Sequence, residues 1–212
     1  QVVSKAGQFR VPYSSIQVSM NEHTYQVLKN GIQHQFNLKN KINFRDYAFD
    51  PLLDVPGKLI PSYLKSADEK NLKSSIQENA FIIQFKTQAF EGYQKEIKKL
   101  GAKIFTPLHD HSLIILAKNE QIEELKKMPF VRWVGPFHPA YKLEASLKNE
   151  VQLKHAEQIR YSILLLDKSL QQELINFIQN IGGKIELKTT SNRFEASLSG
   201  AQLLAVAQVI LH

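Results

Sequence analysis

One stretch of this 212-residue chain occurs twice, and the repeat limits the folds that the chain can adopt. Residues 100–104, LGAKI, match residues 181–185, IGGKI, at an offset of 81 residues. Burial constrains the inward positions of a folded unit, whereas water tolerates change at the outward ones. The sequence therefore predicts two copies of one unit. Without a gap, the same offset places apolar residues on apolar residues: Ile82 on Ile163, Tyr93 on Leu174, Ile97 on Ile178, Leu113 on Phe194, Ile115 on Ala196, Ile122 on Leu203 and Leu125 on Val206.

Each copy is predicted to contain strand, helix, strand, strand, helix and strand. In the first copy we expect strands at residues 80–85, 103–108, 113–117 and 131–134. Gly101 is expected to end the first helix in the left-handed conformation, and Asn119 to cap the second helix. This βαββαβ order is typical of an α+β, ferredoxin-like unit, in which an antiparallel sheet has both helices on one face. We expect the other face to be open and to serve as the functional surface.

The repeat divides the chain into three predicted regions. Residues 79–145 and 146–212 form the two units, and residues 1–78 precede them. At the offset of 81, Phe130 corresponds to Leu211, so the second unit lacks its last strand. A sheet short of one strand leaves backbone groups unpaired along an edge. We therefore expect that the parent polypeptide continues and that this chain was cut from it.

The N-terminal region contains a predicted hairpin and an irregular connector. Residues 24–38 alternate on both sides of Asn30-Gly31, which suits a two-residue turn. Residues 49–64 contain three prolines, which exclude a continuous helix or a central strand. We expect Asp50 to cap a turn of this connector. Its apolar residues are expected to lie against a neighbouring surface: Leu52, Leu53, Leu59, Ile60 and Leu64.

The composition excludes several classes of function. The chain has no cysteine, which excludes disulfides, thiolate metal sites and a cysteine nucleophile. No apolar run approaches the roughly 18–20 residues of a membrane span. There is no Gly-rich phosphate loop, and we expect no cofactor. The formal net charge of +7 is spread along predicted helices, so we interpret it as solvated surface rather than a nucleic-acid groove.

One short motif and one single residue are candidates for a metal site and a partner-binding site. His109 and His111 flank Asp110 and resemble metal ligands, because alternating side chains of a strand share a face. They lie where a hairpin turn is expected, however, and the turn is the preferred interpretation. Trp133 is predicted to pack in the core or to anchor a partner, with the core role favoured.

Four strings of residues resemble a known family. They are residues 49–53 (FDPLL) followed by Pro56 and Pro61, residues 82–85 (IIQF), residues 100–102 (LGA) and residues 129–143 (PFVRWVGPFHPAYKL). Together they resemble the inhibitor-type propeptide units of subtilisin-like serine proteases. The resemblance is strongest to the N-terminal regions of secreted bacterial subtilases with tandem propeptide-like units, and it extends over residues 49–212.

The resemblance implies a role as intramolecular chaperone and temporary inhibitor of a subtilisin-like catalytic domain. In that family the open sheet face docks on the catalytic domain, and the segment after the last strand lies in the substrate cleft as an added strand. It also implies secretion or export to the periplasm, with the signal peptide already removed. The residues implied to bind the protease are Trp133, Val134, Gly135, Pro136, Phe137, Leu211 and His212.

The chain lacks the Gly-containing Asp, His and Ser motifs of an active subtilase, so we expect no catalysis by this chain itself. Two alternatives remain. The units could form a retained interaction module of the protease that does not inhibit it. They could instead bind RNA, but that would need exposed aromatic residues on the central strands, which the Ile- and Leu-rich strands do not provide.

Overall fold

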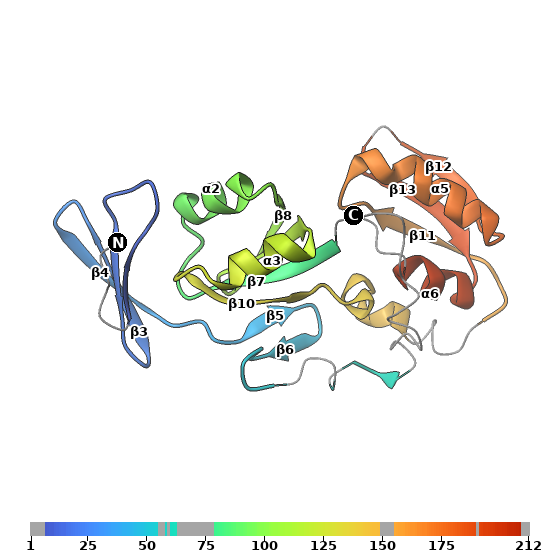
Figure 1. Cartoon of the computed structure of the whole chain (residues 1–212). Coiled ribbons are helices and arrows are strands. Elements are labelled where there is room, and N and C mark those ends of the chain that lie inside the picture. Colours follow the sequence, from blue (N-terminus) through green and yellow to red (C-terminus); the bar gives the residue numbers. More distant parts are fainter. Residues whose placement is uncertain are drawn as a thin grey trace. The chain divides into compact units, whose positions relative to one another are not determined.

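The computed structural model describes residues 7–54, 58, 60–62, 79–148, 155–189 and 191–208. These residues form a mixed α+β protein with antiparallel sheets, as predicted (Figure 1). The chain divides into two compact units. The first contains Gln1–Phe44, Ala48–Val55 and Phe81–Pro136, and the second contains Arg45–Tyr47, Pro56–Ala80 and Phe137–His212. Among the described helices, none has the length and apolarity needed to cross a membrane.

A four-stranded antiparallel sheet opens the first unit. Its strands are β1 (Gln8–Arg10), β2 (Gln17–Met20), β3 (Thr24–Lys29) and β4 (Ile32–Asn37), paired in sequence order. The predicted hairpin is confirmed: β3 pairs with β4 up to Lys29 opposite Ile32. Asn30 and Gly31 between them have φ values of 52° and 78°, which a two-residue hairpin turn requires. A short two-stranded sheet follows, formed by β5 (Ile42–Phe44) and β6 (Tyr47–Phe49).

The main sheet of the first unit has the strand order β10-β7-β9-β8. Its strands are β7 (Asn79–Phe85), β8 (Lys103–Leu108), β9 (Ser112–Ala117) and β10 (Val131–Pro136), and its helices are α2 (Glu91–Lys99) and α3 (Asn119–Lys126). Gly101 has a φ of 84° after α2, as expected. The expectation for Asn119 is wrong. It is already helical, and Lys118 precedes the helix with its N–H donating to Oε1 of Gln121 at 2.8 Å.

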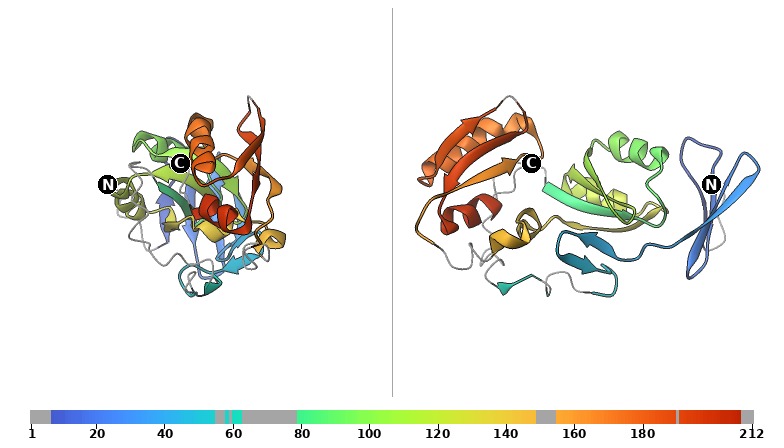
Figure 2. Two further views of the ribbon diagram at one scale, coloured as in Figure 1. Left: turned by 90° about the vertical axis from the view of Figure 1, so that its right-hand side faces the viewer. Right: turned by 180° about the vertical axis from the view of Figure 1, so that it is seen from behind.

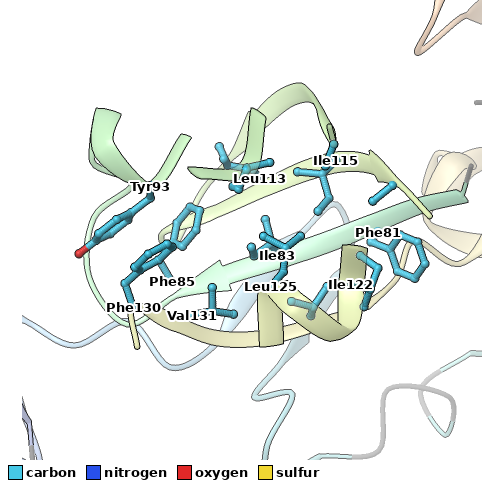
Figure 3. Close-up of a cluster of buried hydrophobic side chains, with 14 of the residues drawn as sticks. Phe81, Ile83, Phe85, Tyr93, Leu113, Ile115, Ile122, Leu125, Phe130 and Val131 are labelled. Carbon is cyan, nitrogen blue, oxygen red and sulfur yellow. The ribbon is translucent and has the colours of Figure 1, made fainter. Parts of the chain in front are cut away.

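The core of the first unit lies between this sheet and its helices (Figure 3). Phe85, Tyr93 and Phe130 gather at one end of it, where the rings of Tyr93 and Phe130 stack with centroids 4.1 Å apart. The N-terminal sheet joins the same core through Val11, Val18, Tyr25 and Val27. The N-terminal strands are thus part of the first unit rather than a separate lead-in.

The second unit contains a three-stranded sheet in the order β11-β13-β12. Its elements are η2 (Pro139–Lys142), β11 (Ile159–Leu164), η3 (Lys168–Leu170), α5 (Gln171–Asn180), β12 (Lys184–Lys188), β13 (Arg193–Leu198) and α6 (Gly200–Gln208). Seen from behind, the strands lie in front of α5 (Figure 2). The described elements from β7 to α3 recur as β11 to α6 at close to the offset of 81 residues.

Individual hydrogen bonds recur at the same offset. Gln121 donates through Nε2 to the carbonyl of Leu100 at 2.7 Å, and Gln202 donates to the carbonyl of Ile181 at 2.8 Å. In each case the amide side chain ties the start of the second helix to the end of the first. Gln is acceptor and donor at once, because its Oε1 also receives the N–H three residues before it.

An irregularity in strand pairing also recurs. The register of β8 against β9 shifts between Ile104 and Thr106, and the register of β12 against β13 shifts between Ile185 and Leu187. A β-bulge inserts one extra, unpaired residue into a strand, and it is a specific feature of a fold. Its presence at equivalent positions indicates that the two segments share backbone detail as well as apolar pattern.

Lys142 in η2 is expected to give the second unit a pH-dependent stability. Burial lowers the pKa of this amine to about 8, from an ordinary value of 10.5. Between these values the unfolded chain holds the proton more often than the folded chain. The contribution of Lys142 to the free energy of unfolding is therefore least favourable below pH 8 and becomes more favourable as the pH rises towards 10.5. Lys142→Met is expected to flatten this rise and to raise the melting temperature near neutral pH. Melting curves across the window check this, and Lys98→Met on an exposed helix position is the control; equal slopes for all three proteins would contradict it.

Candidate protein-binding surface

The sheet face of the first unit that lies opposite its helices is buried, which overturns the expectation of an open face there. Gln84 has 0% exposure although it lies in the middle of an apolar strand. The chain itself covers this position. Nε2 of Gln84 donates to the carbonyls of Lys39 at 3.1 Å and Asn40 at 3.3 Å. On this face the buried residues of β7 and β9 are Ile82, Gln84, Ser112, Ile114 and Leu116.

Arg132 holds the covering segment in place. Its guanidinium donates to Asp50 Oδ1 at 2.7 Å, to Gln84 Oε1 at 2.7 Å and to the carbonyl of Asn40 at 2.9 Å. The side chains of Arg132 and Asp50 are only 12% and 7% exposed, so the ion pair is largely removed from water. We call Arg132, Asp50, Gln84 and Asn40 the polar clasp. Its members come from segments far apart in the sequence, and we did not predict it.

The connector is attached differently from the prediction. Leu52 and Leu53 are exposed rather than packed against a surface, whereas Ile60 is buried as predicted. Leu59 and Leu64 lie outside the described residues. Asp50 does cap the turn, because Oδ1 accepts from the N–H of Leu52 at 3.0 Å. The connector is therefore attached by the side chain of Asp50, which is bonded to Arg132, rather than by the two leucines.

The equivalent sheet face of the second unit is partly exposed and carries both polar and apolar side chains. Along β13 the buried residues Phe194, Ala196 and Leu198 alternate with the less buried Glu195 and Ser197. Adjacent strands share faces, so the register places Arg160 of β11 beside Ser197, and Ser162 beside Glu195. This surface is called the second-unit face, and its residues are Arg160, Ser162, Leu164, Glu186, Leu187, Glu195 and Ser197.

Charge pairs cross the second-unit face. Arg160 forms an ion pair with Glu195, and the hydroxyl of Ser197 donates to Glu186 at 2.8 Å. This hydrogen bond and the ion pair with Lys184 lower the pKa of Glu186. Such exposed pairs contribute little to stability. They can be exchanged for contacts with a partner at small cost.

The outer edge of β11 completes the candidate surface. Among the described residues, β11 pairs only with β13, whereas its counterpart β7 pairs on both sides. The N–H of Leu165 donates to Asn192, so alternation directs the N–H groups of Arg160, Ser162 and Leu164 away from β13. Leu164 is 58% exposed beside this edge. An unpaired edge with an exposed apolar side chain is suited to strand addition.

Of the residues implied to bind a protease, those that the structure describes lie in β10 or directly after it. Val134, Gly135 and Phe137 are buried, Trp133 is half-buried and Pro136 is exposed. The ring of Trp133 meets the ring of Phe49 edge to face, with centroids 6.3 Å apart. Leu211 and His212 lie outside the described residues. Their binding role stays a prediction.

The predicted turn at His109-Asp110-His111 is present between β8 and β9. Asp110 and His111 both have positive φ values, and the Asp110 carboxylate accepts two hydrogen bonds from Asn43. His111 meets the ring of Tyr25 edge to face, and burial followed by Lys39 lowers the pKa of its imidazole. His109 is exposed. Within the part of the chain that the structure describes, no three His, Cys, Asp or Glu residues gather as metal ligands.

Comparison with known proteins gives no relative. No family model, no curated protein and no solved structure matches the chain. The functional interpretation therefore depends on the residues themselves.

Proposed function

We propose that this chain is the non-catalytic pro-region of a secreted, subtilisin-like serine protease. In this proposal the two units are tandem ferredoxin-like copies, and they assist folding of the catalytic domain and inhibit it temporarily. One observation supports a division of labour between them. The first sheet has four strands and a covered second face, whereas the described second sheet has three strands, an exposed face and an unpaired edge.

The second-unit face and the β11 edge are proposed to carry the docking. Outward N–H and C=O groups of β11 can pair with an extended segment of the protease, and Leu164 can enter an apolar contact beside it. Arg160 and Glu195 can re-pair with charges of the partner, which favours the correct orientation. Binding that is tighter to the folded than to the unfolded catalytic domain would produce both assistance and inhibition.

The decisive test adds this chain in trans to a mature subtilisin-like protease. The expected result is slower hydrolysis of a chromogenic peptide and a higher yield when the denatured protease is refolded. Ser162→Pro removes one outward N–H without touching the β13 ladder, and it is expected to weaken inhibition about tenfold. Ser162→Thr keeps that N–H and is the matched control.

The outcomes separate the proposal from its rival. Unchanged hydrolysis together with unchanged refolding yield would overturn it. Binding measured by calorimetry without inhibition would instead favour a retained interaction module. Equal inhibition by Ser162→Pro and Ser162→Thr would remove the β11 edge from the docking surface while leaving the pro-region role intact.

A further inference from the structure

Another strand edge, which has no partner in the part of the chain that the structure describes, lies on the N-terminal sheet, in a different unit from the proposed protease-docking surface. In the order β1-β2-β3-β4, strand β4 is terminal, and all six of its residues are exposed. Natural edge strands usually carry a lysine, a proline or a bulge that prevents pairing with another chain. The sequence of β4, IQHQFN, contains no charged residue and no proline, and its register against β3 is unbroken. The edge is therefore unprotected.

A hollow with a volume of about 380 Å³ lies beside β4. One side of it is formed by the hairpin, whose residues Val27, Ile32 and Phe36 share a face, and the other side by Phe90 and Gln88. Ile32 is 60% exposed and Phe36 is 39% exposed. The hollow thus presents apolar surface to water next to unpaired backbone groups. Its lining consists of Ile16, Val27, Lys29, Asn30, Ile32, His34, Phe36, Gln88 and Phe90.

The lining of this hollow contains one charged side chain, that of Lys29. No acidic residue occurs from His23 to Arg45, and the lining contains a lysine but no carboxylate. Two copies of this chain pairing edge to edge would supply no carboxylate from this lining to Lys29, so a second copy offers no charge complementarity at the hollow. An anionic occupant is favoured instead. Of the cations of this stretch, Lys29 lines the hollow, whereas Arg45 forms an ion pair with Glu144.

We infer that β4 and the adjoining hollow form a binding site for an extended acidic peptide segment that carries an apolar residue. The peptide adds as a strand to β4, its apolar side chain enters the hollow against Ile32 and Phe36, and its carboxylates face Lys29. The backbone supplies affinity and the hollow supplies selectivity. A nucleic acid fits less well, since its bases could stack on the aromatic lining but would leave the backbone groups of the strand edge unpaired.

The turn geometry identifies the backbone groups that would take part. A two-residue turn makes Lys29 and Ile32 a hydrogen-bonded pair, and bonded pairs then alternate along the hairpin. The N–H groups of Gln33, Gln35 and Asn37 consequently point away from β3. Proline at position 35 removes an outward N–H while leaving the β3 ladder intact.

The test uses the whole chain and a fluorescein-labelled decapeptide with Ser at every second position and Val and Glu alternating at the others, because alternate residues of an added strand share a face. Anisotropy is expected to report saturable binding, and amide shifts to map to β4 and to residues 88–90. The same peptide with Lys in place of each Glu should bind at least tenfold more weakly. Lys29→Glu and Phe36→Gln should each weaken binding several-fold. Gln35→Pro should weaken binding about tenfold, whereas Gln35→Thr should not change it.

Leu28→Gln is the matched control for Phe36→Gln. Leu28 lies on the opposite face of the same hairpin and has the same 39% exposure. Circular dichroism of each variant verifies that the sheet is retained. Equal weakening by both glutamine variants, or equal binding of the two peptides, would overturn the site. Concentration-dependent dimers broken by Gln35→Pro, or tighter binding of single-stranded RNA at the same amides, would assign the edge to a different occupant and overturn the peptide.

Discussion

Arg132→Met is expected to lower the free energy of unfolding by about 3–5 kcal/mol, the cost of breaking a buried ion pair from one side. Methionine fills the space of the arginine stem but supplies no donor. The Asp50 carboxylate and Gln84 Oε1 would each lose a hydrogen bond of 2.7 Å in a region that water reaches poorly. Urea unfolding, followed by circular dichroism and tryptophan fluorescence, measures the loss. Trp133 is the single tryptophan and sits beside Phe49, so its emission reports on the covering segment.

Arg160→Met provides the matched control, because Arg160 forms an ion pair with Glu195 on the exposed second-unit face. Its loss is expected to cost less than about 1 kcal/mol. A double variant, Arg132→Met with Asp50→Leu, removes both charges of the clasp. It should recover part of the stability, since it leaves no unpaired carboxylate. Similar losses for Arg132→Met and Arg160→Met would show that the clasp is not effectively buried.

Gly92→Ala is expected to destabilise the protein by up to about 3 kcal/mol, although alanine ordinarily stabilises a helix relative to glycine. Gly92 lies in the first turn of α2 and is buried against the N-terminal sheet. A Cβ at this position would stand 2.1 Å from the backbone oxygen of Pro12 and 3.0 Å from Cγ1 of Val11. Because a backbone atom cannot move aside cheaply, the helix and the sheet must separate.

Thermal unfolding, together with limited proteolysis of the N-terminal sheet, tests the Gly92 variant. Cleavage within residues 7–37 should become faster in Gly92→Ala. Lys98→Ala, at an exposed position of the same helix, should leave both measurements nearly unchanged. A gain of roughly 0.5–1 kcal/mol in Gly92→Ala, as expected for an unhindered helix, would show that the two elements do not touch there.

Repetition made the elements of both units predictable. Each apolar position of the unit occurs in both copies, so a residue that is apolar by chance in one copy can be recognised from the other. Gly101 and Gly182 illustrate the gain: their φ values of 84° and 83° end equivalent helices as the matched LGAKI and IGGKI strings predict. Local periodicity is sufficient for such features, because burial against the same sheet sets both the spacing and the end of each helix.

Contacts between distant segments were less predictable. The prolines of residues 49–64 indicated an irregular connector, and the described residues 51–54 form a turn, but periodicity could not show that Asp50 meets Arg132, which is 82 positions away. Gln84 was the available signal. A polar residue in the middle of a strand that reads FIIQF must find hydrogen-bond partners, and its buried amide implied a covering segment. We expected an open face on both sheets. The repeat contains no difference between the copies that would predict a covered face on the first sheet alone.

The polar clasp can form only after Arg132 has been synthesised. The carbonyl of Asn40 is bonded to a guanidinium that follows 92 residues later, so it leaves the ribosome seconds before its partner is made, at roughly 5–20 residues per second. During that interval residues 39–54 lack the Arg132 side chain that holds them in the folded unit. Nascent chains stalled before Arg132 should expose it to chaperones, and those stalled well beyond Arg132 should not.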